Sequence, residues 1–264
     1  MANISAKDVQ ALRRMTGAGI LDCKRALEQA DGDMEAAKQL LREWGLAGAG
    51  KLAGREASEG AVALAVTGRG AAIVELRCET DFVAKSDSFV SLTDELAQLV
   101  AAKGEAAADE RKDAIDELRT TLKENISLGQ VVRFEAGEDS TVGSYLHVQS
   151  GRGVNAVLVE MRAGTEELAH DVAVHIAFAR PLYVSRDEVP PEEVAAERST
   201  LETISRNEGK PEAAIDKIVE GRLNGWFAER VLLEQKYARD EKVTIAQLIG
   251  SAEIVRFAQV VVGS

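Results

Sequence analysis

The spacing of apolar residues divides the chain into a helical beginning and a mixed remainder. In residues 1–46, three successive segments carry apolar side chains at helical spacing, and Ser5 with Asp8 resembles a capping box ahead of the first. Glycine-containing turns at 16–19 and 31–33 separate these segments. Further along, strand-like apolar runs alternate with amphipathic helical patterns. We therefore expect an α+β fold that begins with a three-helix module.

The remainder of the chain repeats one pattern twice. Gly60–Gly70 and Gly143–Gly153 both begin and end with glycine and share a Gly-Arg-Gly sequence. Each continues into an apolar run, and the two runs end alike, in Val74–Arg77 and in Val159–Arg162. Helical patterns and closing strands follow, with helices expected at 89–102, 108–123 and 166–179 and closing strands at 131–134 and 254–257. The core is thus predicted to be two similar halves, each a small sheet with helices on one face.

Two further helical patterns interrupt the second half. They cover 190–207 and 211–236, both start with proline, and a Gly-Lys-Pro break separates them. This arrangement predicts an antiparallel helical hairpin inserted into the core. The predicted division begins with a three-helix module (1–46) and a linker whose composition also allows some helix (47–59). Core subdomain N (60–139) and core subdomain C (140–184 with 238–264) follow, and the hairpin (185–237) is inserted into subdomain C.

The segment Cys78–Asp87 is present in only one of the two halves. After Arg162 the second half reaches its next helix pattern near Thr165, whereas the first half interposes this extra segment. It places the aromatic Phe82 beside an acidic residue at the expected tip of a loop. A loop that the sister half omits is more readily explained by function than by the needs of the fold.

Composition and charge exclude several classes of function. The net charge of −12 disfavours general binding to nucleic acid or to anionic membranes, which reward clustered Lys and Arg. Apolar runs fall short of the ~20 residues that a membrane helix needs, and residues 1–10 are polar rather than signal-like. With only two cysteines, far apart in sequence, free thiols are expected. These features favour a soluble cytoplasmic protein.

Two motifs that suggest an enzyme fail on their context. The segment Gly45–Leu52 nearly matches a phosphate-binding loop, but Leu52 lacks the hydroxyl that Mg²⁺ requires and the segment follows a helix pattern, so a linker is preferred. A nucleophilic Cys78 lacks a nearby base, and its acidic neighbours, Glu75, Glu79 and Asp81, are expected to raise the thiol pKa. The three histidines, His147, His170 and His175, form no zinc or catalytic pattern with the cysteines. We therefore expect no enzyme activity, no metal and no cofactor.

Four stretches of the chain resemble one known family. They are Leu12–Leu27, with Thr-Gly-Ala-Gly followed by Cys-Lys; Cys78–Lys85, Cys-Glu-Thr-Asp-Phe-Val-Ala-Lys; His175–Ala177 with Pro181; and Val219–Arg222. In this order they resemble the elongation factor Ts family, the bacterial exchange factors that release nucleotide from elongation factor Tu. That family has a ubiquitin-associated-like helical module, a two-part core and an inserted helical hairpin. The resemblance therefore implies the same layout as the apolar pattern does.

The chain also departs from the family in three places. Ile20 and Leu21 stand where methionines are common, and they remain apolar. Leu122-Lys123 replaces an Ile-Gly pair before Glu-Asn, which puts a minor contact in doubt. We expect no counterpart of the additional C-terminal helical module that some members have and others lack.

The resemblance assigns roles to eight residues. It places Thr80, Asp81, Phe82 and Val83 against the nucleotide domain of elongation factor Tu, near its Mg²⁺. It implies further contacts by the helical module and by the second hairpin of the core, through Ile20, Leu21, Lys24 and His147. The expected partner is elongation factor Tu, GDP-bound and nucleotide-free, with a homodimer through the helical hairpin as a further hypothesis.

Two alternatives from other classes stay open at this point. In the first, the chain is an adaptor whose three-helix module binds another helix or peptide, so that Phe82 is dispensable. In the second, it is an enzyme that uses Cys78, so that turnover depends on the thiol.

Overall fold

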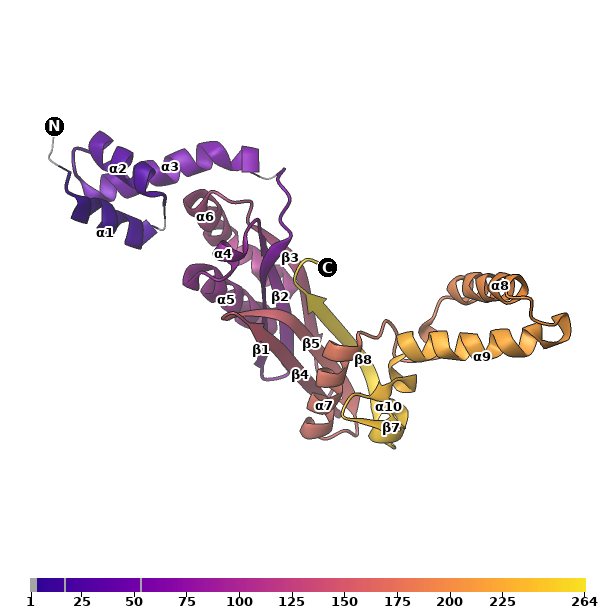
Figure 1. The fold of residues 1–264 in the computed structure, drawn as a ribbon. Coiled ribbons are helices and arrows are strands. Elements are labelled where there is room, and N and C mark those ends of the chain that lie inside the picture. Colours follow the sequence, from indigo (N-terminus) through magenta and orange to yellow (C-terminus); the bar gives the residue numbers. More distant parts are fainter. Residues whose placement is uncertain (1–3, 17, 53) are drawn as a thin grey trace. The chain divides into compact units, whose positions relative to one another are not determined.

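A computed structural model describes residues 4–16, 18–52 and 54–264, with the backbone alone for 45–51 (Figure 1). Helices and short antiparallel strands are both present, as the α+β prediction requires. The chain forms two compact units: residues 1–135 with 146–156 and 260–264, and residues 136–145 with 157–259. The finer division into five segments stays a prediction.

Three helices form the start of the chain: α1 (Ala6–Thr16), α2 (Ile20–Gln29) and α3 (Met34–Leu52). The expected cap is confirmed, because the Asp8 amide donates to Ser5 Oγ (3.2 Å) and the Ser5 amide donates to Asp8 Oδ2 (3.1 Å). Apolar side chains on one face of each helix make a common small core. Gly17, in the predicted first turn, lies outside the described residues. The third helix runs into the predicted linker as far as Leu52, since no proline interrupts it.

The first half of the core is a three-stranded antiparallel sheet. Its strands are β1 (Glu59–Thr67), β2 (Gly70–Cys78) and β3 (Ser127–Glu135), with β2 in the centre. Helix α5 (Asp87–Lys103) lies against β1 and β2 (Figure 1). Its apolar side chains form one core with those of the two strands, and α6 (Lys112–Leu122) adds to the same core. The helix predicted at 108–123 begins instead with 3₁₀ turns, η1 (Glu105–Arg111).

The second half repeats this sheet. Strands β4 (Ser140–Gln149), β5 (Arg152–Arg162) and β8 (Glu253–Val261) have the order β4-β5-β8, so β5 corresponds to the central β2. Helix α7 (Glu166–Ala179) has the predicted bounds, because the Thr165 side chain caps its first turn. The prediction of two small sheets with helices is confirmed.

Two features occur in both halves: a glycine where a helix closely approaches the sheet, although at different positions of the repeat, and a buried acid in the central strand. A Cβ atom on Gly70 would lie 2.0 Å from the Ala101 carbonyl oxygen of α5, and one on Gly143 would lie 2.2 Å from the Ala169 backbone of α7, so helix and sheet approach too closely for a side chain. The acid that follows Val in both central strands is buried in both. Glu75 accepts from Arg77 Nε (2.9 Å), and Glu160 accepts from Arg256 Nε (2.7 Å).

Between β5 and β8 the chain adds further elements: η2 (Arg186–Glu188), α8 (Pro191–Asn207), α9 (Glu212–Arg230), η3 (Leu232–Glu234), β6 (Lys236–Tyr237), β7 (Asp240–Thr244) and α10 (Ile245–Ile249). Helices α8 and α9 share an apolar cluster to which Leu201 and Phe227 belong. The second helix of the hairpin was predicted to reach Lys236, but it ends at Arg230. Beyond that point the Leu232 amide donates to the Tyr183 carbonyl (2.8 Å) instead of to a carbonyl of the helix. The short strands β6 and β7 and helix α10 were not predicted.

Candidate functional site

The segment that distinguishes the two halves forms a short helix rather than an irregular loop. Helix α4 (Asp81–Ala84) follows β2, and the Thr80 hydroxyl caps it by accepting the Val83 amide (3.4 Å). The Ser86 hydroxyl closes its far end by donating to the Val83 carbonyl (2.8 Å). The prediction of an irregular loop at this position is therefore wrong. A single helical turn is stable here because polar side chains at both ends bond to backbone amide and carbonyl groups that have no partner within the turn.

Phe82 projects from this turn into solvent. Its side chain is 84% exposed, whereas Ala84 is buried and Val83 packs partly against the core of the first half. Contacts of these two side chains with the core fix the turn to the protein, so the exposed ring has a fixed support. An isolated aromatic side chain of this exposure has a large apolar surface available for a partner.

Glu124 holds the start of this turn, although it was not among the predicted site residues. One carboxylate oxygen accepts the backbone amides of Glu79 (3.1 Å) and Thr80 (3.0 Å), and the other accepts the Thr80 hydroxyl. Glu124 follows α6 and lies 44 residues beyond Thr80 in the chain. The only signal in the sequence was the Glu-Asn pair at the end of the expected helix.

In a second set of hydrogen bonds, Glu79 is the acceptor and Asn125 is a donor. The Glu79 carboxylate accepts the Asn125 backbone amide (2.7 Å), and the Asn125 side chain donates to the Arg55 carbonyl (2.6 Å). The Arg55 guanidinium in turn lies 3.5 Å from Glu79. Residues 79–80 and 124–125 therefore bind each other reciprocally, each pair through a carboxylate and backbone amides.

Asp81 is ionised and paired. The Lys85 ammonium one turn later donates to its carboxylate, and this hydrogen bond holds the pKa of Asp81 below its usual range. Both side chains remain partly exposed. Such a surface pair contributes little to stability, so a partner can exchange it for its own contacts.

Cys78 has the properties of a core residue. It is fully buried and its thiol donates to the Thr80 carbonyl (3.2 Å). Burial, with the Glu124 carboxylate as the next cause, raises the pKa of the Cys78 thiol to about 12. The predicted direction is right, but the main cause is burial rather than the acids adjacent in sequence. The thiol is therefore poorly suited to act as a nucleophile.

The predicted residues of the helical module lie on α2. Ile20 and Leu21 are exposed large apolar side chains, and Lys24 pairs with Glu28 across one turn (3.7 Å). Cys23 and Leu27 on the same helix are fully buried in the module core. Helix α2 therefore has a core face and an exposed face, and the residues implied as contacts lie outside the core.

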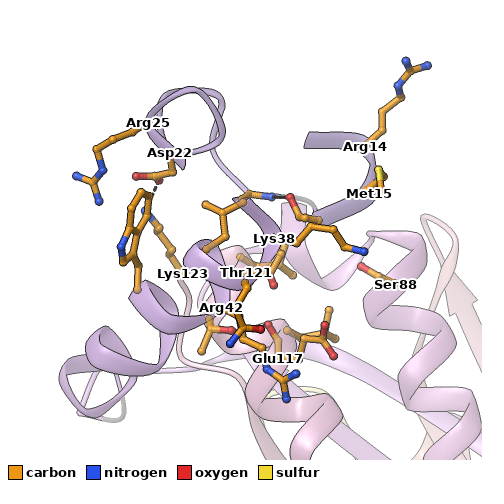
Figure 2. A pocket seen from close by; sticks show the side chains of 18 of the residues that line it. Arg14, Met15, Asp22, Arg25, Lys38, Arg42, Ser88, Glu117, Thr121 and Lys123 are labelled. Atoms are coloured by element: carbon orange, nitrogen blue, oxygen red, sulfur yellow. Dashed lines mark hydrogen bonds and ion pairs between the residues drawn. The ribbon is translucent and has the colours of Figure 1, made fainter. Parts of the chain in front are cut away.

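A cleft of about 640 Å³ lies beside these helices, lined by residues of α1, α2, α3, α5 and α6 (Figure 2). Its polar side chains include the Asp22–Lys123 ion pair, drawn as a dashed line in Figure 2, and the Lys38–Glu35 pair. None of the eight predicted site residues lines it. It therefore adds nothing to the proposed contacts.

The three histidines have different surroundings. His147 is exposed on β4, in a different element from α2 and α4. His170 Nδ1 lies 2.8 Å from the Ser144 carbonyl oxygen and so donates to it. His175 is buried and hydrogen-bonded at both ring nitrogens, so it has a packing role in the core. The eight predicted residues thus fall on three elements, and only 80–83 form one turn.

In the part of the chain that the structure describes, no three His, Cys, Asp or Glu side chains are placed to hold a metal ion. None of the helices described there is both long enough and apolar enough to cross a bilayer. Both described cysteines are free and buried, as predicted.

Comparison with known proteins gives a consistent result. A family model described as "Elongation factor TS" matches residues 79–264. The chain is 42% identical to an elongation factor Ts of Clavibacter michiganensis subsp. michiganensis, with both chains fully covered. Proteins of the same description from Acidothermus cellulolyticus (43%, all of this chain and 99% of the relative) and a Nocardioides species (44%, both fully covered) are similar to it as well.

Proposed function

The chain belongs to the elongation factor Ts family, and on that basis we propose that it binds elongation factor Tu carrying GDP and promotes GDP release, so that GTP can bind. In this role it is a cytoplasmic translation factor. It makes and breaks no covalent bond, and it needs no cofactor of its own.

The observation that carries the proposal is the presentation of Phe82. A ring that is 84% exposed, on a turn anchored by buried Ala84 and by hydrogen bonds to Glu124, can enter a partner without rearranging its own support. Full burial of a phenylalanine side chain supplies about 1.5–3 kcal/mol. Anchoring reduces the entropy that would otherwise be lost on binding.

We assign Thr80, Asp81, Phe82 and Val83 to the displacement of the partner's Mg²⁺. Mg²⁺ requires near-octahedral oxygen ligands and neutralises nucleotide phosphates. An inserted aromatic ring separates the groups that hold the ion and offers no oxygen in return. Asp81, which is ionised, can accept hydrogen bonds from the displaced backbone. With the ion displaced, the diphosphate charge is poorly compensated and GDP leaves faster.

The energetics of exchange are reciprocal. If the chain weakens GDP binding to elongation factor Tu by some factor, GDP weakens binding of the chain by the same factor. Nucleotide-free elongation factor Tu is therefore the tightest binding partner. The return of GTP then releases the chain.

The remaining predicted residues are proposed as auxiliary contacts. Exposed Ile20 and Leu21, with Lys24 beside them, form an apolar surface with a positive charge at its edge. His147 is proposed to approach the phosphate-binding region of the partner. The three-helix module itself is proposed to be ubiquitin-associated-like, in keeping with the family resemblance.

A homodimer through the helical hairpin stays a hypothesis. Of the apolar residues expected on the second arm, Leu223, Phe227 and Leu232 are buried within the chain and Trp226 packs partly against the same cluster as Leu223, while Ile204 on α8 is exposed. Analytical ultracentrifugation over a range of concentrations tests it.

The test of the function is release of a fluorescent GDP analogue from elongation factor Tu. The wild-type chain should accelerate release in a concentration-dependent way. Phe82→Ala should lower the maximal rate constant by about 30-fold, which corresponds to roughly 2 kcal/mol. Phe178 is a matched control, since it is also an exposed phenylalanine (78%).

Phe178→Ala should exchange nucleotide like the wild type. No acceleration by the wild-type chain would refute the exchange function and favour the adaptor alternative. Equal losses in both phenylalanine variants would show that Phe82 has no special role.

A further inference from the structure

The reciprocal bonds between residues 79–80 and 124–125 form a structure that we call the clasp, made of Glu79, Thr80, Glu124 and Asn125. It joins the end of β2 to the end of α6. Its members are buried or partly buried, except for Thr80, which lies at the surface. The clasp thus lies directly before the turn that carries Phe82.

The chain reaches the clasp through a sharp change of direction. Lys123, the residue that ends α6, has a left-handed backbone (φ 58°), and its amide donates to the Arg119 carbonyl (3.0 Å). Residues other than glycine rarely adopt this backbone conformation. Here it ends the helix and directs Glu124 toward the backbone of Glu79 and Thr80.

Glu124 acts on the turn through the hydroxyl of Thr80. This hydroxyl has one proton, which it donates to Glu124. Its lone pairs therefore stay free to accept the Val83 amide, the bond that caps α4. Without Glu124, the hydroxyl proton is free to rotate and the two amides of Glu79 and Thr80 lose their acceptor.

A turn of four residues depends on such support. Isolated helices of that length are unstable, because nucleation fixes several residues for a single backbone bond. α4 is held by the buried Ala84 at one end and by the Thr80 cap at the other. Phe82 lies between these two supports, so the direction of its ring depends on both.

We propose that Glu124 is a positioning residue for nucleotide exchange: through the clasp and the Thr80 cap it fixes the direction in which Phe82 enters the partner. This inference rests on the proposed exchange function. Glu124 acts through Thr80, and the effect of its loss is expected on the rate of GDP release more than on the affinity for the partner.

The first test compares three variants in the GDP-release assay. Glu124→Ala removes the carboxylate that accepts the Glu79 and Thr80 amides and the Thr80 hydroxyl, and it should lower the maximal rate constant by about tenfold, as expected for loss of charge-assisted hydrogen bonds. Half-saturation should shift by less than threefold. Glu124→Gln keeps one acceptor oxygen and should restore part of the rate. Glu110→Ala, which removes an exposed carboxylate paired with Lys103, is the control and should behave like the wild type.

The second test is a double-mutant cycle with Phe82. If Glu124 acts by directing the ring, Glu124→Ala should change the rate by less than twofold once Phe82 is already alanine. An equal loss in both backgrounds would overturn the proposal. So would a loss confined to affinity, or a Glu124→Ala variant as fast as the wild type.

The third test needs no partner and so separates this inference from the proposed function. Hydrogen exchange should become faster at the amides of Glu79, Thr80 and Val83 in Glu124→Ala, while the amides of β2 keep their protection. Thr80→Val provides a second variant that removes the hydroxyl alone, and it should release the Val83 amide. Unchanged exchange at these amides refutes the clasp even if the wild-type chain is active. Faster exchange in an inactive wild type would refute only the assigned function.

Discussion

Acidification below about pH 6.5 is expected to destabilise the structure around His175, because this side chain is suited only to the neutral form. It is 1% exposed on α7. Its Nδ1 accepts the Ala238 amide (3.2 Å), so the proton lies on Nε2, which donates to Gln235 Oε1 (3.0 Å). A second proton would be placed on Nδ1, facing an amide that is itself a donor.

The sign and size of the effect follow from linkage. Burial lowers the pKa of His175, and the hydrogen bond to Gln235 only partly opposes this. Between the folded pKa and the unfolded value of about 6.5, the unfolded chain binds more protons, so the free energy of unfolding falls as pH falls. The slope reaches at most ~1.4 kcal/mol per pH unit in that window. It vanishes above the window and again below the folded pKa.

Urea unfolding at several values between about pH 7.5 and 5.5 measures this slope. The chain has two tryptophans. In a Trp44→Phe background, fluorescence reports on Trp226, which belongs to the same compact unit as His175. The range stays above the region in which most carboxylates titrate.

Two substitutions isolate the contribution of His175. His175→Gln keeps a side-chain acceptor but cannot titrate, so its slope below about pH 6.5 should be smaller by up to ~1.4 kcal/mol per unit. His170→Gln removes an exposed histidine from the same helix and should keep the wild-type slope. Equal slopes in His175→Gln and in the wild type would refute the reasoning, whatever the absolute stabilities are.

Two further predictions follow from burial. Burial raises the thiol pKa of both cysteines, to about 12 for Cys78. Neither Cys78 nor Cys23 should therefore react with an alkylating reagent at pH 8 until urea unfolds the chain. Rapid labelling of the native protein would contradict their buried positions. Leu21→Ala should weaken binding to elongation factor Tu in calorimetry while leaving thermal unfolding unchanged, because this side chain is 78% exposed. Leu27→Ala, in the core of the same helix, should instead cost about 2–5 kcal/mol of stability, and the reverse pattern would show that the two faces of α2 are wrongly assigned.

The elements that the sequence predicted well are long and have a strong local signal. α7 has the expected bounds because a capping threonine precedes a continuous apolar face and Arg180, in a left-handed conformation, follows it. The two hairpins were found because glycines mark both their turns and the places where helices approach the sheets. The cap of α7 and the turn glycines are local signals, whereas the glycines at the helix–sheet contacts are required by Ala101 and Ala169, which are distant in sequence.

The elements that were missed are too short to show a period. α4 has four residues, α10 has five, and β6 has two. Tertiary bonds determine them instead: β6 pairs with β7, and α4 needs Glu124. The residues of the candidate site were likewise predicted only in part. Phe82 was identified by resemblance and by the asymmetry of the halves. Glu124 binds mainly backbone amides, which any residue supplies, so the sequence showed only the Glu-Asn pair and not its hydrogen-bond partners.

The two halves together show why α4 is more than a connection. In the second half, β5 ends at Arg162 and α7 begins at Glu166, so three residues join a central strand to the helix that packs on it. In the first half, β2 ends at Cys78 and α5 begins at Asp87, so eight residues make the same join. The additional residues bury Ala84 but expose Phe82 almost fully, and they need a carboxylate from beyond α6 to hold their cap. A connection shaped only by folding would turn its aromatic ring inward, where burial would stabilise the chain. The outward ring, on a turn that only one half contains, therefore supports the proposal that Phe82 is buried in a complex.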